Sequence, residues 1–171
     1  MTERTTDFFP EAPPPRGFFA RHSGKFWCFS IVLALLWMGV IFFASTQLGS
    51  AGNTYEIVCD LAKWIHPGAS PDTLVNINVV IRKLAHATEY SILSLLVSWV
   101  CLRSPWKWLR SYWLLVAILV VLLYSSSDEF HQTFVPDRDG TITDVMLDTG
   151  AGTAAALLLA LWRRARRTRR E

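Results

Sequence analysis

Four long runs of apolar residues divide the chain, and each has about the length of a membrane span. The first run, residues 26–44, holds nineteen residues without a charge, and the others cover residues 84–102, 111–127 and 141–162. A helix needs about 20 predominantly apolar residues to cross a bilayer. Because the apolar region of a secretory signal has only about 7–15 residues, we expect the first run to be retained. The pattern predicts an all-α integral membrane protein with four transmembrane helices.

Local signals mark where some of these helices begin and end. Ser70 followed by Pro71 is typical of an N-cap and a first helical position, so the second helix is expected to begin ahead of the membrane, near Asp72. The second span ends at Arg103. The helical pattern of the third span continues beyond its apolar run until Pro136, because proline disfavours helical backbone in the residue before it.

A short amphipathic helix is predicted in the outer loop between spans 1 and 2. Apolar residues recur there at helical spacing with charged residues between them. The apolar positions are Ile57, Leu61, Trp64 and Ile65, and the charged positions are Glu56, Asp60 and Lys63. A helix of this kind lies in the membrane interface. It either caps the bundle or takes part in binding.

The basic residues indicate how the spans are oriented. If both termini are cytoplasmic, the inner segments hold thirteen of the seventeen Lys and Arg residues and the outer segments hold four. Cytoplasmic loops carry an excess of Lys and Arg, and tryptophan is enriched at the interfaces. Five tryptophans would then gather at the inner interface: Trp27, Trp106, Trp108, Trp113 and Trp162. We therefore predict that both termini lie inside (N-in/C-in).

Composition separates one membrane domain from two polar tails. Residues 1–25, which include several prolines, are predicted to be a disordered cytoplasmic tail, residues 26–162 the four-helix membrane domain, and residues 163–171 an Arg-rich cytoplasmic tail. Since the arginines directly follow an apolar run, they indicate a membrane anchor, and no nucleic-acid partner is expected. Charged residues make up 18% of the chain, against about 25% in soluble domains. The three cysteines are widely spaced and indicate neither a disulfide framework nor a zinc finger.

Ionisable side chains gather at one depth, on the outer side of the predicted bundle. On the second span, residues at i, i+3 and i+7 share a helix face, namely Lys83, His86 and Tyr90, with Glu89 on the flank. On the fourth span, Asp144 and Asp148 share a face that continues into small residues, which permit close approach of another helix. The third span and the hairpin after it add Asp128, Glu129, His131, Gln132 and Arg138.

The charges in this band are unbalanced. Seven carboxylates face three bases; the acids are Glu89, Asp128, Glu129, Asp137, Asp139, Asp144 and Asp148, and the bases are Arg82, Lys83 and Arg138. A charge at the bilayer centre costs about 2.5–3.5 kcal/mol and normally faces the bundle or water. One interpretation is a structural network in which the bases pair with some acids and hold the helices together. The surplus of acids favours a functional site, which solvent, protonation, histidinium or a bound cation would balance.

No metal and no cofactor are predicted. His86 and Glu89, at i and i+3, are acceptable ligand types, but neither an H-E-x-x-H nor a C-x-x-C spacing occurs. A glycine-rich phosphate loop is also missing from the sequence.

Several of these motifs, taken in order, resemble the VanZ-like family of membrane proteins. Residues 82–90, Arg-Lys-Leu-Ala-His-Ala-Thr-Glu-Tyr, are similar to its R-K-x-x-H-x-x-E-Y signature, and further segments match at residues 42–47, 127–138 and 144–150. The family often has glycine where Asp137 stands and asparagine where Asp148 stands. The additional carboxylate of Asp148 changes the local charge balance.

The resemblance implies a small multi-pass protein of the bacterial cytoplasmic membrane, linked through the family's founding member to low-level resistance to the glycopeptide teicoplanin. We hypothesise that the outward-facing cluster binds a lipid-linked or cell-surface headgroup, with or without modifying it. Besides membrane lipids, a lipid-linked envelope precursor and a glycopeptide are the partners considered. The candidate catalytic residues are His86, Glu89, Asp128 and Glu129. The candidate ligand-binding residues are Lys83, Tyr90, Gln132, Arg138, Asp144 and Asp148.

Two other functions stay open. In the first, the protein is a non-enzymatic structural or masking protein of the membrane. In the second, it is a proton-coupled transporter, because intramembrane carboxylates and histidines can relay protons. Four short spans with polar groups on one side disfavour the transporter.

Overall fold

The computed structural model describes residues 18–46, 70–136, 138 and 140–169, together with residues 55, 58–62, 64 and 68 of the first loop. Its helices are α1 (Phe18–Ala44), α3 (Pro71–Arg103), α4 (Lys107–Ser111), α5 (Trp113–Gln132) and α6 (Ile142–Thr168). Four of them, α1, α3, α5 and α6, are long and apolar enough to cross a membrane. The prediction of an all-α protein with four spans is confirmed.

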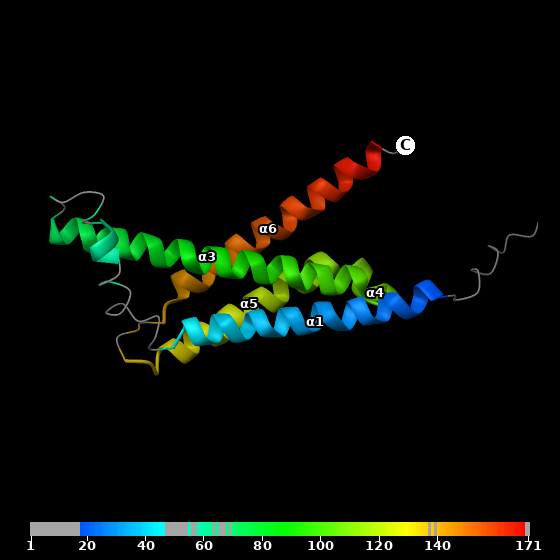
Figure 1. Cartoon of the computed structure of the whole chain (residues 1–171), viewed down its shortest axis with the longest axis horizontal. Helices are drawn as coiled ribbons and strands as arrows, with labels where there is room; N and C mark the ends of the chain where they lie inside the picture. Colours follow the sequence, from blue (N-terminus) through cyan, green and yellow to red (C-terminus); the bar gives the residue numbers. More distant parts are fainter. Residues whose placement is uncertain are drawn as a thin grey trace, which may run out of the picture.

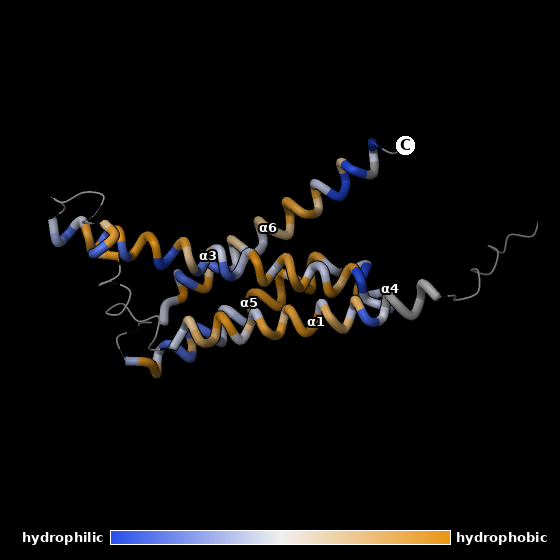
Figure 2. The backbone as a smooth tube through the Cα atoms, in the orientation of Figure 1, coloured by the Kyte–Doolittle hydropathy of each residue, from blue (hydrophilic) through white to orange (hydrophobic). Residues whose placement is uncertain are grey.

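The four long helices form a bundle with two different ends (Figure 1). At one end α1 and α5 finish and α6 starts; we call this the polar end, because Asp128 and Asp144 lie there. At the other end α1 starts and α3 and α6 finish; we call this the basic end, after Arg103 and Arg163. Figure 2 shows apolar residues along the middle of the helices and hydrophilic residues near both ends. Large apolar side chains such as Leu36 and Leu123 are exposed on the outside, as expected of surfaces that contact lipid.

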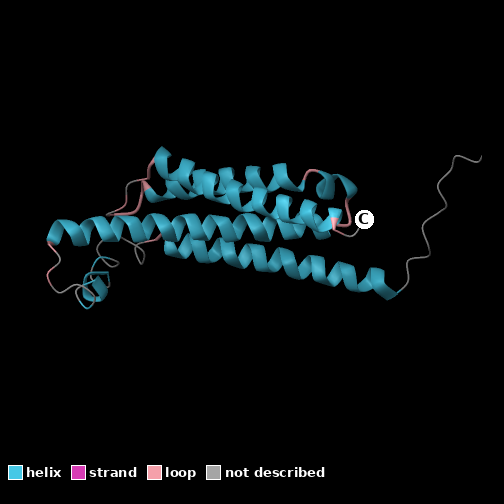
Figure 3. Cartoon of the chain, turned by 90° about the horizontal axis from the view of Figure 1, so that it is seen from above, coloured by secondary structure: helices cyan, strands magenta, loops and turns pink. Residues whose placement is uncertain are grey.

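α3 is the longest helix and starts where the sequence predicts. Ser70 is its N-cap and accepts a hydrogen bond from the backbone N–H of Thr73, and Pro71 occupies the first turn. Its 33 residues span about 50 Å at about 1.5 Å per residue, which exceeds a hydrocarbon core of about 30 Å. The first turns of α3 therefore project past α1 and α5 at the polar end (Figure 3).

Both terminal helices extend beyond their predicted spans. α1 already begins at Phe18, so residues 18–25 are helical, and α6 continues to Thr168. Arginine is a good helix former, and the guanidinium of Arg166 lies 4.1 Å from the ring centre of Trp162, one turn earlier. The predicted boundaries at residues 25 and 163 are therefore not helix ends. Residues 1–17 of the predicted N-terminal tail lie outside the described residues.

α5 ends before the position that the sequence predicts. The helix stops at Gln132, and the chain continues in tighter turns, in which Phe134 N–H donates to His131 O and Val135 N–H donates to Gln132 O, both at 3.0 Å. Pro136 has no N–H to donate and disfavours helical backbone at Val135, so its effect reaches several residues back. α4, a single turn after Pro105, was not predicted.

The predicted short helix of the first loop is present, with helical backbone at residues 55, 58–62 and 64. Val58 and Cys59 are buried, whereas Leu61 and Trp64 are exposed. Other positions of the predicted pattern, residues 56, 57, 63 and 65, lie outside the described residues. The helix thus covers part of the protein with one side and turns Leu61 and Trp64 outward.

α6 packs closely on α3 and α5 at Gly152. A Cβ at this position would lie 2.9 Å from Val121 Cγ1 and 3.2 Å from the backbone oxygen of Tyr90. Ser91 Oγ also donates to the Ala151 oxygen at 3.3 Å. The small residues predicted to permit helix contact therefore do so, and this contact sets the distance between α3 and α6 where the polar end begins.

Candidate functional site

The Asp128 carboxylate joins three helices at the polar end. Its Oδ2 accepts hydrogen bonds from Ser45 Oγ at 2.8 Å, Tyr90 OH at 3.1 Å and Gln132 Nε2 at 3.1 Å. Ser45 follows α1, Tyr90 lies on α3, and Asp128 and Gln132 lie on α5. Asp128 is only 5% exposed. Neutral donors, rather than a salt bridge, therefore accommodate this carboxylate, and we call the four residues the Asp128 network.

Glu129 connects α5 to the start of α6. Its Oε2 accepts the backbone N–H of Thr141 at 2.9 Å and its Oε1 accepts Gln132 Nε2 at 3.3 Å. Thr141 also begins α6, because its Oγ1 accepts the N–H of Asp144 at 3.2 Å. Gly140 permits this arrangement, because a Cβ there would overlap the backbone oxygen of Glu129.

Arg138 ties the α5–α6 turn to α1. One terminal nitrogen donates to the Ala44 oxygen at 2.7 Å and the other donates to Gln132 Oε1 at 3.2 Å. The residue is buried, and burial together with the charge of Arg82 lowers the pKa of its guanidinium, while Asp128 and Glu129 act in the opposite direction. Arg138 therefore holds the turn in position.

Two contacts between a basic and an acidic side chain link α3 and α6, which run in the same direction. Lys83 Nζ lies 3.9 Å from Asp144 Oδ1, and one turn deeper His86 Nδ1 lies 3.5 Å from Asp148 Oδ2. The side chain of Lys83 is 55% exposed and that of Asp148 is fully buried. The outer contact, between Lys83 and Asp144, is accessible. The inner contact, between His86 and Asp148, is closed off. The predicted shared faces of both helices are confirmed.

The contact between His86 and Asp148 adds no hydrogen bond. Among the described residues, neither oxygen of Asp148 accepts a hydrogen bond, and His86 Nδ1 takes part in none. Glu129 lies beside this pair: one ligand atom from each of His86, Glu129 and Asp148 falls within 4.8 Å of the others. Each of the three residues comes from a different helix, so no sequence spacing could have indicated the group.

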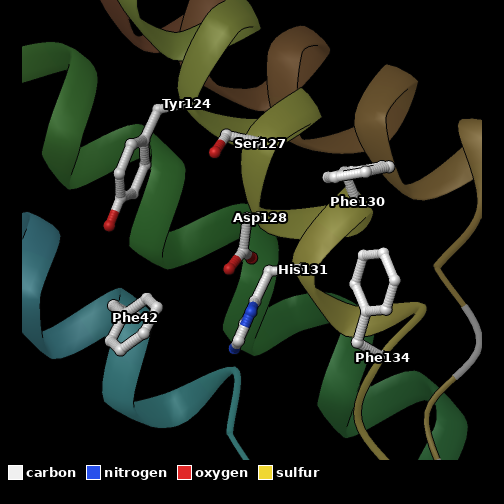
Figure 4. A pocket seen from close by; sticks show the side chains of 7 residues that line it. All are labelled: Phe42, Tyr124, Ser127, Asp128, Phe130, His131 and Phe134. Atoms are coloured by element: carbon white, nitrogen blue, oxygen red, sulfur yellow. The ribbon is translucent and has the colours of Figure 1, made fainter.

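A cavity of about 250 Å³ adjoins the Asp128 network between α1 and α5 (Figure 4). Its wall is mainly aromatic, with Phe42 on α1 and Tyr124, Phe130 and Phe134 on the α5 side. Its other members are polar: Ser127, Asp128 and His131. The His131 ring stacks on Phe42 with 5.0 Å between ring centres. His131, predicted to belong to the ionisable band, therefore lies on the aromatic side of Asp128.

The structure brings most of the predicted site residues together and adds others. Glu89 is half-buried, and its backbone oxygen accepts Trp37 Nε1 at 2.9 Å. The residues that the sequence reasoning missed are Ser45 and Thr141. Ser45 stands within the motif at residues 42–47, and Thr141 is a preferred N-cap type directly before a helix, so both had a signal.

Four membrane-spanning helices that converge on a buried ionisable cluster define a small multi-pass membrane protein. The VanZ/LLP1 family model matches residues 29–163, which include most of every span, and the chain belongs to this family. The resemblance seen in the motifs is thereby confirmed. No curated protein and no solved structure matches the chain.

Proposed function

We propose that this protein binds the anionic headgroup of a lipid or lipid-linked envelope precursor at its polar end. In this proposal it resides in the bacterial cytoplasmic membrane with both termini inside and the polar end outside. The distribution of charge supports this orientation, because Arg103, Arg110 and the arginines after Trp162 all lie at the basic end.

The exposed ammonium group of Lys83 carries the proposal. At 3.9 Å its contact with Asp144 is too long for a hydrogen bond, and more than half of the side chain is accessible. Arg82, the preceding residue, is half-buried and adds a second positive charge near this rim. A phosphate or carboxylate that approaches from outside meets Lys83 first and can form charge-assisted hydrogen bonds with it.

The buried members of the cluster support this contact without reaching the ligand themselves. Tyr90, Asp128 and Gln132 are buried, and Tyr90 and Gln132 both donate to the Asp128 carboxylate, which fixes α3 against α5. Arg138 does the same for α1 and the turn before α6. In the proposal these four are positioning residues. His86, behind Lys83, and Glu129 are the candidates for proton transfer if a reaction follows binding.

The resemblance to proteins linked with teicoplanin resistance gives this proposal a biological context. A protein that occupies an envelope headgroup would change its exposure to a glycopeptide. The three hydrogen bonds that Asp128 Oδ2 accepts are the observation that favours the alternative, a purely structural role for the cluster.

The test is a titration of the detergent-purified protein with dihexanoyl phosphatidic acid, with dihexanoyl phosphatidylcholine as the neutral comparison. Loss of one charge-assisted contact in Lys83→Gln costs about 1.5–3 kcal/mol, so its affinity for the anionic lipid should fall about 10- to 100-fold. Lys25→Gln is the matched control, since Lys25 is an exposed lysine of α1 at the basic end. Equal affinities of Lys83→Gln and the wild type would contradict the proposal.

A further inference from the structure

The side chains of His86, Glu129 and Asp148 lie close together at the polar end, with too few hydrogen-bond donors for the two carboxylates. Asp148 is fully buried and Glu129 is 4% exposed. Glu129 is hydrogen-bonded through both oxygens, but neither oxygen of Asp148 accepts a hydrogen bond from the described residues. An anionic oxygen that is buried without a donor is costly, and more so within a membrane. A positive partner would remove this cost and leave both carboxylates ionised.

The neighbouring cations do not fully supply that partner. The ion pair of Lys83 goes to Asp144, one turn away along α6. His86 Nδ1 lies 3.5 Å from Asp148 Oδ2, which is longer than a usual N–H···O hydrogen bond, so it balances that carboxylate only weakly. A protonated His86 also carries a single charge, which balances one carboxylate and leaves the other.

The distances between the three groups suit a small cation. A zinc ion binds nitrogen and oxygen ligands at about 2.0–2.2 Å, which places tetrahedral ligands about 3.4 Å apart. The 3.5 Å between His86 Nδ1 and Asp148 Oδ2 already has this value. The ligand atoms of all three residues lie within 4.8 Å of one another, so a movement of at most about 1.4 Å brings Glu129 to ligand spacing.

We propose that His86, Glu129 and Asp148 bind a divalent transition-metal ion, with zinc as the ion that suits the set best. The imidazole favours zinc over magnesium or calcium, and the two carboxylates balance its charge. Three protein ligands leave a fourth position open, as in catalytic zinc sites. The hydrogen bonds from Thr141 and Gln132 to Glu129 hold that ligand in place.

The metal site would add a second contact to the headgroup proposed to bind at Lys83, and this role of the metal rests on the proposed function. An oxygen of a headgroup held by Lys83 is the kind of ligand that an open position on zinc accepts. The proposed site depends on the negative charge of Asp148, because an asparagine at this position would supply only a neutral amide oxygen.

The test is zinc binding to detergent-purified protein from which the affinity tag has been removed. After EDTA treatment, the protein is loaded with zinc chloride, desalted and measured by elemental mass spectrometry and calorimetry. The wild type should bind about one zinc ion per chain. His86→Ala and Asp148→Asn should lower the zinc affinity at least about 100-fold. Mutating a residue that only hydrogen-bonds to a metal ligand already lowers metal affinity about 10- to 100-fold, and these two residues are proposed as direct ligands.

Matched controls separate this site from other acids and histidines. Asp144→Asn changes the neighbouring carboxylate of the same helix face, and His131→Ala removes a histidine from the aromatic cavity. Both should retain zinc. If zinc binding disappears in His131→Ala or persists in Asp148→Asn, the assigned ligand set is wrong.

A second measurement covers the case in which a ligand variant fails to fold. Zinc should raise the thermal unfolding midpoint of the wild-type protein and of Asp144→Asn, while magnesium at the same concentration should not, since a bound ligand stabilises the folded state. A wild type that neither binds zinc nor is stabilised by it overturns the metal site but leaves headgroup binding by Lys83 testable. Conversely, Lys83→Gln should keep zinc while it loses the anionic lipid.

Discussion

The polar end and the basic end of the bundle are held together in different ways. At the polar end, side chains from α1, α3, α5 and α6 contact one another through hydrogen bonds and ion pairs with defined partners. Towards the basic end α6 diverges from α3 (Figure 1), and a cavity of about 520 Å³ lies between residues such as Leu95, Trp99 and Leu159. The polar end is therefore fixed by hydrogen bonds and ion pairs between specific residues, and the basic end by less specific packing.

This difference has a physical cause. Lipid tails are as apolar as leucine, so apolar contact alone gives membrane helices little preference for one arrangement. Hydrogen bonds in the protein interior do specify an arrangement. At the basic end arginines instead stack on aromatic rings, with Arg103 4.7 Å from the ring centre of Trp99. We infer that the polar end carries the function because its geometry is the better defined.

The largest effect is expected from Asp128→Ala. This change leaves the buried donors of Ser45, Tyr90 and Gln132 without their shared acceptor, so the free energy of unfolding should fall by about 2–4 kcal/mol. Unfolding in detergent, followed by tryptophan fluorescence, measures it. In the control Asp144→Ala, at a half-exposed pair, the free energy of unfolding should fall by less than about 1 kcal/mol. Similar losses in both variants would show that the Asp128 network does not hold the polar end together.

Close helix contact is tested by Gly152→Ala, with a slightly smaller expected effect. The added Cβ would lie 2.9 Å from Val121 Cγ1 and 3.2 Å from the backbone of Tyr90, so α6 must shift, at a cost of about 1–3 kcal/mol. Gly150→Ala is the control, because no atom lies within 4 Å of its Cβ, and alanine should be neutral or stabilising there. If both variants are equally stable, the Gly152 contact does not limit the approach of α6.

A single hydrogen bond of the network is removed by Tyr90→Phe. The expected loss is about 0.6–1.7 kcal/mol, the range for hydrogen bonds between membrane helices. Thermal unfolding of the detergent-solubilised variant measures it, alongside Tyr112→Phe at an exposed position of the basic end. A larger loss in Tyr112→Phe than in Tyr90→Phe would reverse the comparison between the two ends.

The smallest effect is expected at the basic end, from Arg166→Gln. Its stacking on Trp162 is exposed, and such cation–π contacts contribute about 0.5–1 kcal/mol. The unfolding midpoint should fall slightly, while the affinity of the polar end for phosphatidic acid should stay at its wild-type value. A large loss of that affinity would show that the two ends are not independent.

Sequence periodicity predicted the spans and the face that Lys83, His86 and Tyr90 share, because helical spacing determines both. It did not predict that Asp128 pairs with Ser45, which directly follows α1 and is 83 residues away in the sequence. Such pairs depend on how closely the helices approach, as at Gly152, where α6 lies close to Val121 and to the backbone of Tyr90. The early end of α5 was missed because the turns before Pro136 have no strong sequence signal.

The central claim, that the exposed cation of the polar end receives an anionic headgroup, is tested most directly by the phosphatidic acid titration of Lys83→Gln beside Lys25→Gln. We predict that the affinity falls about 10- to 100-fold in Lys83→Gln and stays at the wild-type value in Lys25→Gln, because Lys83, unlike Lys25, lies beside the ionisable cluster. Equal binding by all three proteins, or equal binding of phosphatidylcholine, would contradict the claim.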